Sequence, residues 1–288
     1  DVTGDSHYGI YASNSGTDLT ITTALVSGGR TGIYALNNGS GVLSITSTGD
    51  VTGGSDDGIY ADNDGTDLTI STATVSGGTD GIDARNYGTG DLSVTATGLV
   101  TGTTGRGIYA YNYYDGGNLT VNVAAVTGGT DGIFARNDGT GLLSVTATGT
   151  VTANGTYSTG VFAKNYGTDL TISTRSVSGG TGIIATNYGN GSLSVTATGQ
   201  VTGTTGRGIY ARNVGTDLTI SAAVVSGYTD GIYARNDGTG SLSVTASGSA
   251  GETGRGIYAR NEGTDLRITT AAVSGGTRGI AAQNLGSG

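Results

Sequence analysis

Short apolar stretches that alternate with polar residues recur along the whole chain and predict β-strands. Each recurring unit contains three of them: Ile-x-Ala, then Leu-x-Ile or Leu-x-Val, then a later Val such as Val26, Val51, Val75 or Val100. Alternation with a period of two residues is typical of strands that bury one face. No stretch has a helical period over a useful length. Gly, Asn, Asp and Thr separate the pieces, which predicts a turn after each strand.

The motif Gly-Ile-x-Ala-x-Asn gives these strands a fixed order. It occurs twelve times, with Val for Ile in one copy, and starts at residues 9, 32, 58, 81, 107, 132, 160, 182, 208, 231, 256 and 279. A motif that returns every 22 to 28 residues is the signature of a solenoid, in which each copy forms one coil. Parallel crossovers are right-handed. We therefore predict an all-β, right-handed parallel β-helix (β-solenoid) of about twelve coils with three short strands per coil.

The repeat runs unbroken, so we expect residues 1–288 to form one elongated domain rather than two. Twelve coils at the spacing of paired strands make a rod of roughly 55 Å. The inward residues of the first coil are expected to be Ile10, Ala12, Leu19, Ile21 and Val26. The chain has no Met at residue 1, so we expect it to be a fragment of a longer protein.

The Asn that ends the motif is present in every coil. Asn tolerates left-handed backbone and bonds its neighbours, and amides stacked in register can form a hydrogen-bonded ladder. A polar binding stripe is the alternative, but an identical residue at every bend favours a structural role. The predicted ladder consists of Asn14, Asn37, Asn63, Asn86, Asn112, Asn137, Asn165, Asn187, Asn213, Asn236, Asn261 and Asn284.

Two outward positions in the motif carry the candidate binding residues. The residue between Ile and Ala must point outward, since a core would not accept Asp83 there, and it is aromatic in most coils. The residue after Ala also points outward and is basic in several coils. Such a face could stack sugars or hold an anionic chain, although aromatic rows also simply stabilise neighbouring strands. The candidate residues are Tyr109, Phe134, Phe162, Tyr210, Tyr233, Tyr258, Arg136, Lys164, Arg212, Arg235 and Arg260.

The residue just before the motif Gly forms a second charged pattern. Acidic and basic side chains alternate there from coil to coil, which favours pairing between neighbouring coils, although each exposed pair contributes only about 0–1 kcal/mol. The residues concerned are Asp80, Arg106, Asp131, Arg207, Asp230 and Arg255.

The second strand of each coil places Thr and Ser outward in pairs two residues apart, as in Thr20 with Thr22 and Ser93 with Thr95. Flat Thr-x-Thr arrays are the arrangement that ice-binding β-solenoids use. Ser often replaces Thr here, and Asn122 and Arg267 interrupt the rows. Thr is also common on any exposed strand face. Ice binding is therefore kept as an alternative function.

The composition argues against several kinds of chemistry. The net charge is −9, which disfavours nucleic-acid binding. The chain has no Cys and only one His, His7, so the repeat holds neither a Ser-His-Asp triad nor a His/Cys metal cluster. Asp18, Asp67, Asp169, Asp217 and Asp265 recur at every second coil, too far apart to share an ion, and are expected to cap turns. We expect no catalytic residue, metal or cofactor.

Coils of the form Gly-Ile-Tyr-Ala-x-Asn-x-Gly-Thr-Asp-Leu-Thr-Ile, followed by Gly-x-Leu-Ser-Val-Thr-Ala-Thr-Gly, resemble the passenger repeats of bacterial autotransporters (type V secretion). The likeness is closest to those of alphaproteobacteria such as Bartonella and covers residues 9–288. It implies export through a C-terminal outer-membrane β-barrel of the same precursor, with the signal peptide and barrel outside this sequence. It also implies display on the cell surface or release outside the cell, with no other membrane contact.

The same resemblance implies adhesion or interaction with host cells as a virulence factor. The expected partner is a host surface protein or glycan, or another copy of the chain. Three alternatives stay open: a purely structural stalk, an ice-binding solenoid, and a β-helical enzyme that acts on polysaccharides. An enzyme of that kind needs long loops that build a cleft, whereas the insertions here are short, at residues 113–117 and 153–159.

Overall fold

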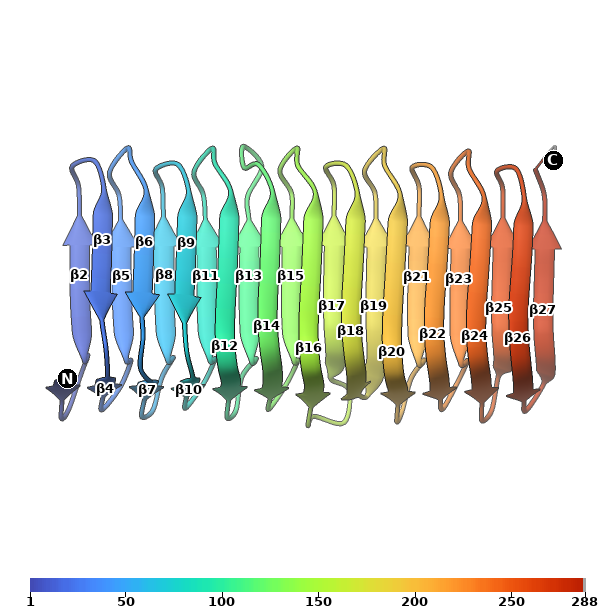
Figure 1. The fold of residues 1–288 in the computed structure, drawn as a ribbon, viewed down its shortest axis with the longest axis horizontal. Coiled ribbons are helices and arrows are strands. Elements are labelled where there is room, and N and C mark those ends of the chain that lie inside the picture. The colour runs from blue at the N-terminus through green and yellow to red at the C-terminus, as the bar shows by residue number, and fades with distance from the viewer. Residues whose placement is uncertain (287–288) are drawn as a thin grey trace.

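A computed structural model describes residues 1–286 as a single stack of parallel coils without a helix. Ser287 and Gly288 of the predicted domain lie outside the described residues. Figure 1 shows the coils side by side along the long axis, with the chain passing from one end of the rod to the other. The all-β parallel solenoid of about twelve coils is therefore confirmed, while its right-handed winding stays a prediction. We number the coils 1 to 12 by their motif copy, so that coil 4 contains Gly81 and coil 8 contains Gly182.

The Ile-x-Ala-x-Asn segments form a 12-stranded parallel sheet in which each strand pairs with its counterpart in the next coil. Ile pairs with Ile, Ala with Ala and Asn with Asn, as in the pairing of Ile82 with Ile108. The strands of this sheet are β2 (Ile10–Asn14), β5 (Ile33–Asn37), β8 (Ile59–Asn63), β11 (Ile82–Asn86), β13 (Ile108–Asn112), β15 (Ile133–Asn137), β17 (Thr159–Asn165), β19 (Thr181–Asn187), β21 (Ile209–Asn213), β23 (Ile232–Asn236), β25 (Arg255–Asn261) and β27 (Arg278–Asn284).

The second and third apolar pieces belong to a 15-stranded sheet. Near the N-terminus they are separate strands, namely β1 (Val2–Gly4), β3 (Leu19–Thr23), β4 (Val26–Gly28), β6 (Leu43–Ser47), β7 (Val51–Gly53), β9 (Leu68–Thr72) and β10 (Val75–Gly77). From coil 4 onward they are continuous, as β12 (Leu92–Gly102), β14 (Leu119–Gly128), β16 (Leu143–Ala153), β18 (Leu170–Gly179), β20 (Leu193–Gly203), β22 (Leu218–Gly227), β24 (Leu242–Gly251) and β26 (Leu266–Gly275).

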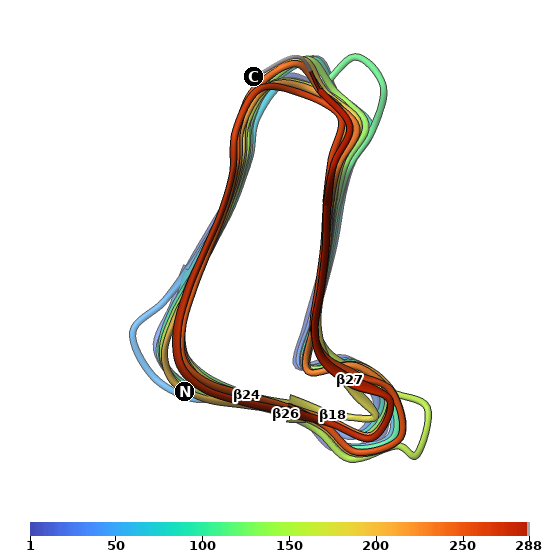
Figure 2. The same ribbon diagram turned by 90° about the vertical axis from the view of Figure 1, so that its right-hand side faces the viewer.

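Three separate strands per coil therefore occur only in the first part of the rod. In the continuous strands a bend takes the place of the expected gap, and in the β12–β14 pair the register shifts between Ala96 and Leu99. A bulge of this kind lets a strand turn a corner while pairing continues on both sides. Figure 2 shows the resulting three-sided outline of the coils. The two short insertions project from this outline, where the colour bar places residues near 115 and near 155.

One narrow apolar column fills the rod. The inward Ile, Leu, Val and Ala side chains of the interior coils are fully buried, as Ile82, Ala84, Leu92, Val94 and Val100 are. In the first coil, Ile10, Ala12 and Leu19 are only partly buried and pack against this core from one side. Because each layer contacts only its neighbours, stability is a sum of stacking contributions along the rod.

The motif Gly and Asn determine how closely the coils approach. A Cβ on Gly81 would lie 2.5 Å from the carbonyl oxygen of Gly107 and 2.7 Å from a methyl group of Val100, so a side chain does not fit there. Each motif Asn except the last donates a hydrogen bond from its Nδ2 to the Oδ1 of the Asn in the next coil, in an unbroken series of 2.7–3.2 Å from Asn14 to Asn284. The structure thus contains the amide ladder that the sequence suggests.

The ladder does not depend on left-handed backbone, because no described residue has a positive φ. The amides also bond the next turn, as Asn86 does when its Nδ2 donates to the carbonyl oxygen of Gly90 at 3.2 Å. From Asn37 to Asn261 every ladder Asn is fully buried. The same residue therefore recurs in every coil because these buried polar groups need hydrogen-bond partners.

Candidate functional site

The outward residues between Ile and Ala, which we call the aromatic row, lie along the 12-stranded sheet in three stacked runs of three rings. The runs are Tyr11–Tyr34–Tyr60, Tyr109–Phe134–Phe162 and Tyr210–Tyr233–Tyr258. Within a run, neighbouring centroids lie 4.6–5.6 Å apart and the ring planes differ by 5–25°. Asp83, Ile184 and Ala281 end the runs, one at every fourth coil.

This stacking determines which ring faces a ligand can reach. Phe134 and Tyr233 each have a ring on both sides, so both of their faces are occupied. Only the end rings of a run have a face that no neighbouring ring covers. A sugar that stacks on an aromatic face needs such an open ring. The breaks in the row are therefore the positions where this face differs from a stack of rings that only stabilises the strands.

The basic row, formed by the residues after the motif Ala, is largely neutralised by acidic partners. Arg136 forms a two-pronged pair with Asp138, at 2.7 Å from Nε and 2.6 Å from Nη2. Arg212 and Arg235 share Asp237, and Arg260 pairs with Glu262 at 2.7 Å.

Lys164, the remaining candidate, makes no ion pair with another described residue. Its Nζ lies 4.9 Å and 5.1 Å from the ring centroids of Tyr166 and Tyr188. The sequence candidates thus lie together on one face, but four of the five cations already have a carboxylate. The acids that pair with them directly follow the motif Asn, in Arg-Asn-Asp and Arg-Asn-Glu, a signal that the sequence interpretation missed.

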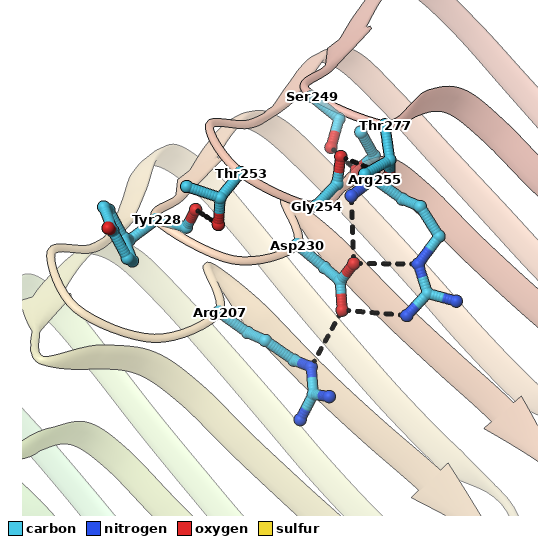
Figure 3. A network of polar contacts seen from close by, with 9 residues as sticks. Arg207, Tyr228, Asp230, Ser249, Thr253, Gly254, Arg255 and Thr277 are labelled. Atoms are coloured by element: carbon cyan, nitrogen blue, oxygen red, sulfur yellow. Dashed lines mark hydrogen bonds and ion pairs between the residues drawn. The ribbon is translucent and has the colours of Figure 1, made fainter.

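The charged residues before the motif Gly pair between coils as the alternation suggests. Arg106 lies 3.5 Å from Asp131, and Asp230 lies between Arg207 and Arg255 (Figure 3). Arg255 binds Asp230 through Nε at 2.9 Å and Nη2 at 3.2 Å, whereas Arg207 uses only Nε, at 3.1 Å. Burial by itself raises the pKa of Asp230, but the hydrogen bonds from both arginines outweigh it and hold the pKa below its usual value.

These corner arginines also contact the aromatic row. The guanidinium carbon of Arg207 lies 5.3 Å and 4.4 Å from the ring centroids of Tyr210 and Tyr233. That of Arg255 lies 4.2 Å from Tyr258. Cation–π contacts at these distances add to the ion pairs and hold the cations against the face. The sequence places the two patterns on one strand, and the structure shows that they form one surface.

At the first break, in coil 4, the row is filled by an ion pair. Asp83 is outward yet buried, and Arg85 binds it through Nε at 2.9 Å and Nη2 at 2.7 Å. The Arg85 guanidinium carbon lies 5.4 Å from the ring centroids of both Tyr60 and Tyr109, the register neighbours of Asp83. Burial raises the pKa of Asp83 to about 6, against the opposing effect of Arg85.

At the second break, in coil 8, the surface is open. Ile184 pairs in register with Phe162 and Tyr210, and the residue two positions on is the short Thr186 instead of an arginine. A hollow of about 550 Å³ lies there. Its lining consists of Thr181, Ile184, Gly206, Arg207, Tyr210 and Thr229.

Comparison of the chain with known protein families, with curated proteins and with solved structures gives no match. The candidate site therefore rests on the geometry of this chain alone.

The acidic residues of the turns cap backbone groups between coils. Asp67 accepts a hydrogen bond from the amide of Asp91 at 2.7 Å, and Asp217 accepts one from Ser241 at 2.7 Å. Asn118 does the same for Leu142 at 3.0 Å, which explains why Asn replaces Asp there.

Among the described residues no group of three His, Cys, Asp or Glu side chains is placed to bind a metal ion. Residues 1–286 also contain no helix that is long and apolar enough to cross a membrane.

The Thr and Ser side chains of the second strand form two rows on the opposite sheet. Ser93, Thr120 and Ser144 follow one another in register, and so do Thr95, Asn122 and Thr146. Each row is interrupted in one coil, the first by Arg267 and the second by Asn122. This hydroxyl face is the most regular exposed surface of the rod, whereas the aromatic face is the one that changes from coil to coil.

Proposed function

We propose that this chain is the rod of a surface-displayed or secreted bacterial protein that binds host-cell surfaces, as the resemblance to autotransporter passengers implies. The observation that carries the proposal is the contrast between an unvarying core and a varying outer face. Ile, Ala and Asn repeat in register, while the outward position between them is Tyr, Phe, Asp, Ile or Ala. A stalk requires only the repeat, whereas recognition requires positions that differ.

Two further properties support export and extracellular folding. The chain has no Cys, so its fold needs no disulfide. All strand pairing is parallel and joins neighbouring coils, so each coil can add to the last as the chain emerges. Both properties suit a protein that crosses an outer membrane unfolded and acts outside the cell.

Binding of the purified, labelled chain to cultured host cells and to immobilised matrix proteins tests the proposal. The informative variant replaces Tyr210, Tyr233 and Tyr258 with Thr, which strands accept on exposed faces. We expect it to lose at least tenfold in binding while its far-ultraviolet circular dichroism stays unchanged.

The matched control changes three residues of one hydroxyl row on the opposite sheet to Ala, namely Thr196, Ser221 and Thr245. This variant should bind like the wild type. Absence of cell and matrix binding by the wild type would instead favour the stalk, and equal binding by both variants would exclude the aromatic face.

The in-register hydroxyl rows favour ice binding as a second candidate function. A flat parallel sheet with hydroxyls repeated along two rows can match a regular lattice of water. Thermal hysteresis of the purified chain is the test. If the hydroxyl rows bind ice, Thr196→Tyr should abolish the hysteresis and Tyr233→Thr on the other face should leave it unchanged.

A further inference from the structure

The open break in coil 8 has the size and lining of a small-ligand site. Its volume of about 550 Å³ falls within the range of about 300–1,000 Å³ that such sites occupy. Its lining includes the aromatic ring of Tyr210 and the apolar side chain of Ile184, while Thr181, Thr229 and Arg207 contribute polar groups. Tyr210 is the end ring of its run, so one of its faces has no ring against it.

The other interior break shows that this place in the row accepts a flat charged group. In coil 4 the guanidinium of Arg85 lies against both neighbouring rings at 5.4 Å and satisfies Asp83. In coil 8 no side chain of the described residues takes that role. Thr186 is too short. The basic residues that pair with it in the neighbouring coils, Lys164 and Arg212, lie against Tyr188. A ligand that stacks on Tyr210 would therefore complete a contact that the chain itself makes in coil 4.

The charge around the hollow indicates the sign of that ligand. Asp230 is shared by Arg207 and Arg255, so this trio carries one positive charge in excess. Arg255 uses two of its nitrogens on Asp230, whereas Arg207 uses only Nε. Figure 3 shows the two terminal nitrogens of Arg207 directed away from Asp230. Their N–H groups make no hydrogen bond to any described residue, and they are suited to the two oxygens of a carboxylate.

We propose that the coil 8 hollow binds a carboxylated pyranose, that is, an acidic sugar residue of an anionic glycan. The apolar face of the sugar ring would stack on Tyr210 above Ile184, and its carboxylate would pair with the terminal N–H groups of Arg207. The hydroxyls of Thr181 and Thr229, which have no hydrogen-bond partner among the described residues, would bond the sugar hydroxyls. This inference rests on the proposed binding function and assigns its ligand class and site.

Calorimetric titration with trigalacturonate tests the proposal, with the methyl ester of the same trisaccharide as the neutral counterpart. The two probes share their rings and hydroxyls and differ only at the carboxyl groups, which are charged in the acid and are neutral methyl esters in its counterpart. We expect the acid to bind and the ester to bind at least tenfold more weakly. Arg207→Gln should weaken binding of the acid at least tenfold, because charged hydrogen bonds are the strong ones. Its fold should persist, since Asp230 keeps the two-pronged pair with Arg255.

Ile184→Phe should abolish binding by filling the hollow. Arg175→Gln, at an exposed position of β18 on the other sheet, should bind like the wild type. Should Arg207→Gln fail to fold, Arg207→Lys serves, with weakened but acid-selective binding expected. No binding of the acid, equal affinity for acid and ester, or an unchanged affinity in Ile184→Phe would each overturn the proposal. Host-cell binding that survives Ile184→Phe would contradict this site while leaving the proposed function intact. Binding of the sugar without binding to host cells would support the site and contradict the proposed function.

Discussion

Coils 4 and 8 interrupt the same aromatic row in opposite ways. In coil 4, Asp83 replaces the ring and Arg85, two residues on, covers the place between Tyr60 and Tyr109. In coil 8, Ile184 replaces the ring and Thr186 is too short to cover anything, so a hollow remains. The two coils share their inward Ile, Ala and Asn. The difference shows that the repeat determines the scaffold, while a pair of outward residues determines whether a break is closed or open.

The closed break should be costly to open. Arg85→Ala would leave Asp83, whose side chain is 6% exposed, without its cation. Removal of one partner costs about 3–5 kcal/mol when both are buried, and the loss should be smaller here because the Arg85 side chain is 33% exposed. We expect the urea midpoint at pH 7 to fall accordingly. Arg235→Ala is the matched control, because its partner Asp237 keeps Arg212, and its loss should stay below about 1 kcal/mol. Equal losses in the two variants would show that coil 4 is not held by this pair.

The same carboxylate should make stability depend on pH. The pKa of Asp83 is about 6 in the folded chain, above its usual value of 3.8, because burial disfavours the charged form. The folded state therefore holds the proton more tightly, and the stabilisation that this gives below pH 3.8 is lost as the pH rises through 6. Each pKa unit corresponds to 1.36 kcal/mol, so the change is at most about 3 kcal/mol.

The comparison with Asp83→Asn isolates this effect. The nearby charges of Arg85, Asp57 and Asp80 are present in both proteins, so most of their own titration cancels in the difference. Between pH 4 and 7 the wild type should lose stability relative to Asp83→Asn when both are unfolded in urea. A difference that stays constant over this range, or one that grows in favour of the wild type, would contradict the assigned pKa shift.

Much of the scaffold could be predicted from sequence because it repeats. The motif Gly, Ile, Ala and Asn occupy the same place in every coil, so their spacing alone gives the number of coils, the inward residues and the amide ladder. The fusion of the second and third strands from β12 onward could not be predicted in the same way. It depends on whether backbone pairing continues through a bulge, and turn residues occur there in either case.

The candidate face was only partly predictable, for a different physical reason. Alternation shows which residues point outward, but it does not show that the rings stack on one another and cover their own faces. The pairing of Arg136 with Asp138 was visible in sequence as Arg-Asn-Asp and required only the inference that both side chains share a face. The hollow could not be inferred, since it depends on the combined volumes of Thr181, Ile184 and Arg207 from two neighbouring coils.

The open break should be the easier of the two to close. Ile184→Phe places a ring between Phe162 and Tyr210, its register neighbours, and so joins two runs of the row into one. Stacked aromatic pairs contribute about 0.5–1.5 kcal/mol beyond the area they bury, and the hollow gives the larger side chain room. We expect the variant to be about 1 kcal/mol more stable in urea, whereas Ile184→Leu, which adds no ring, should not change the midpoint.

A loss of about 1–3 kcal/mol in Ile184→Phe would show overpacking, and thus that the space beside Ile184 cannot accept a ring. That result would also remove the basis for a stacked sugar, because the ring of Phe and the ring of a pyranose need the same space. A gain in stability together with a loss of acidic-sugar binding would show that the substitution blocks the binding site without disturbing the fold. A folded, more stable rod that no longer binds has lost the open face of Tyr210, and the hollow rather than the fold is then the site.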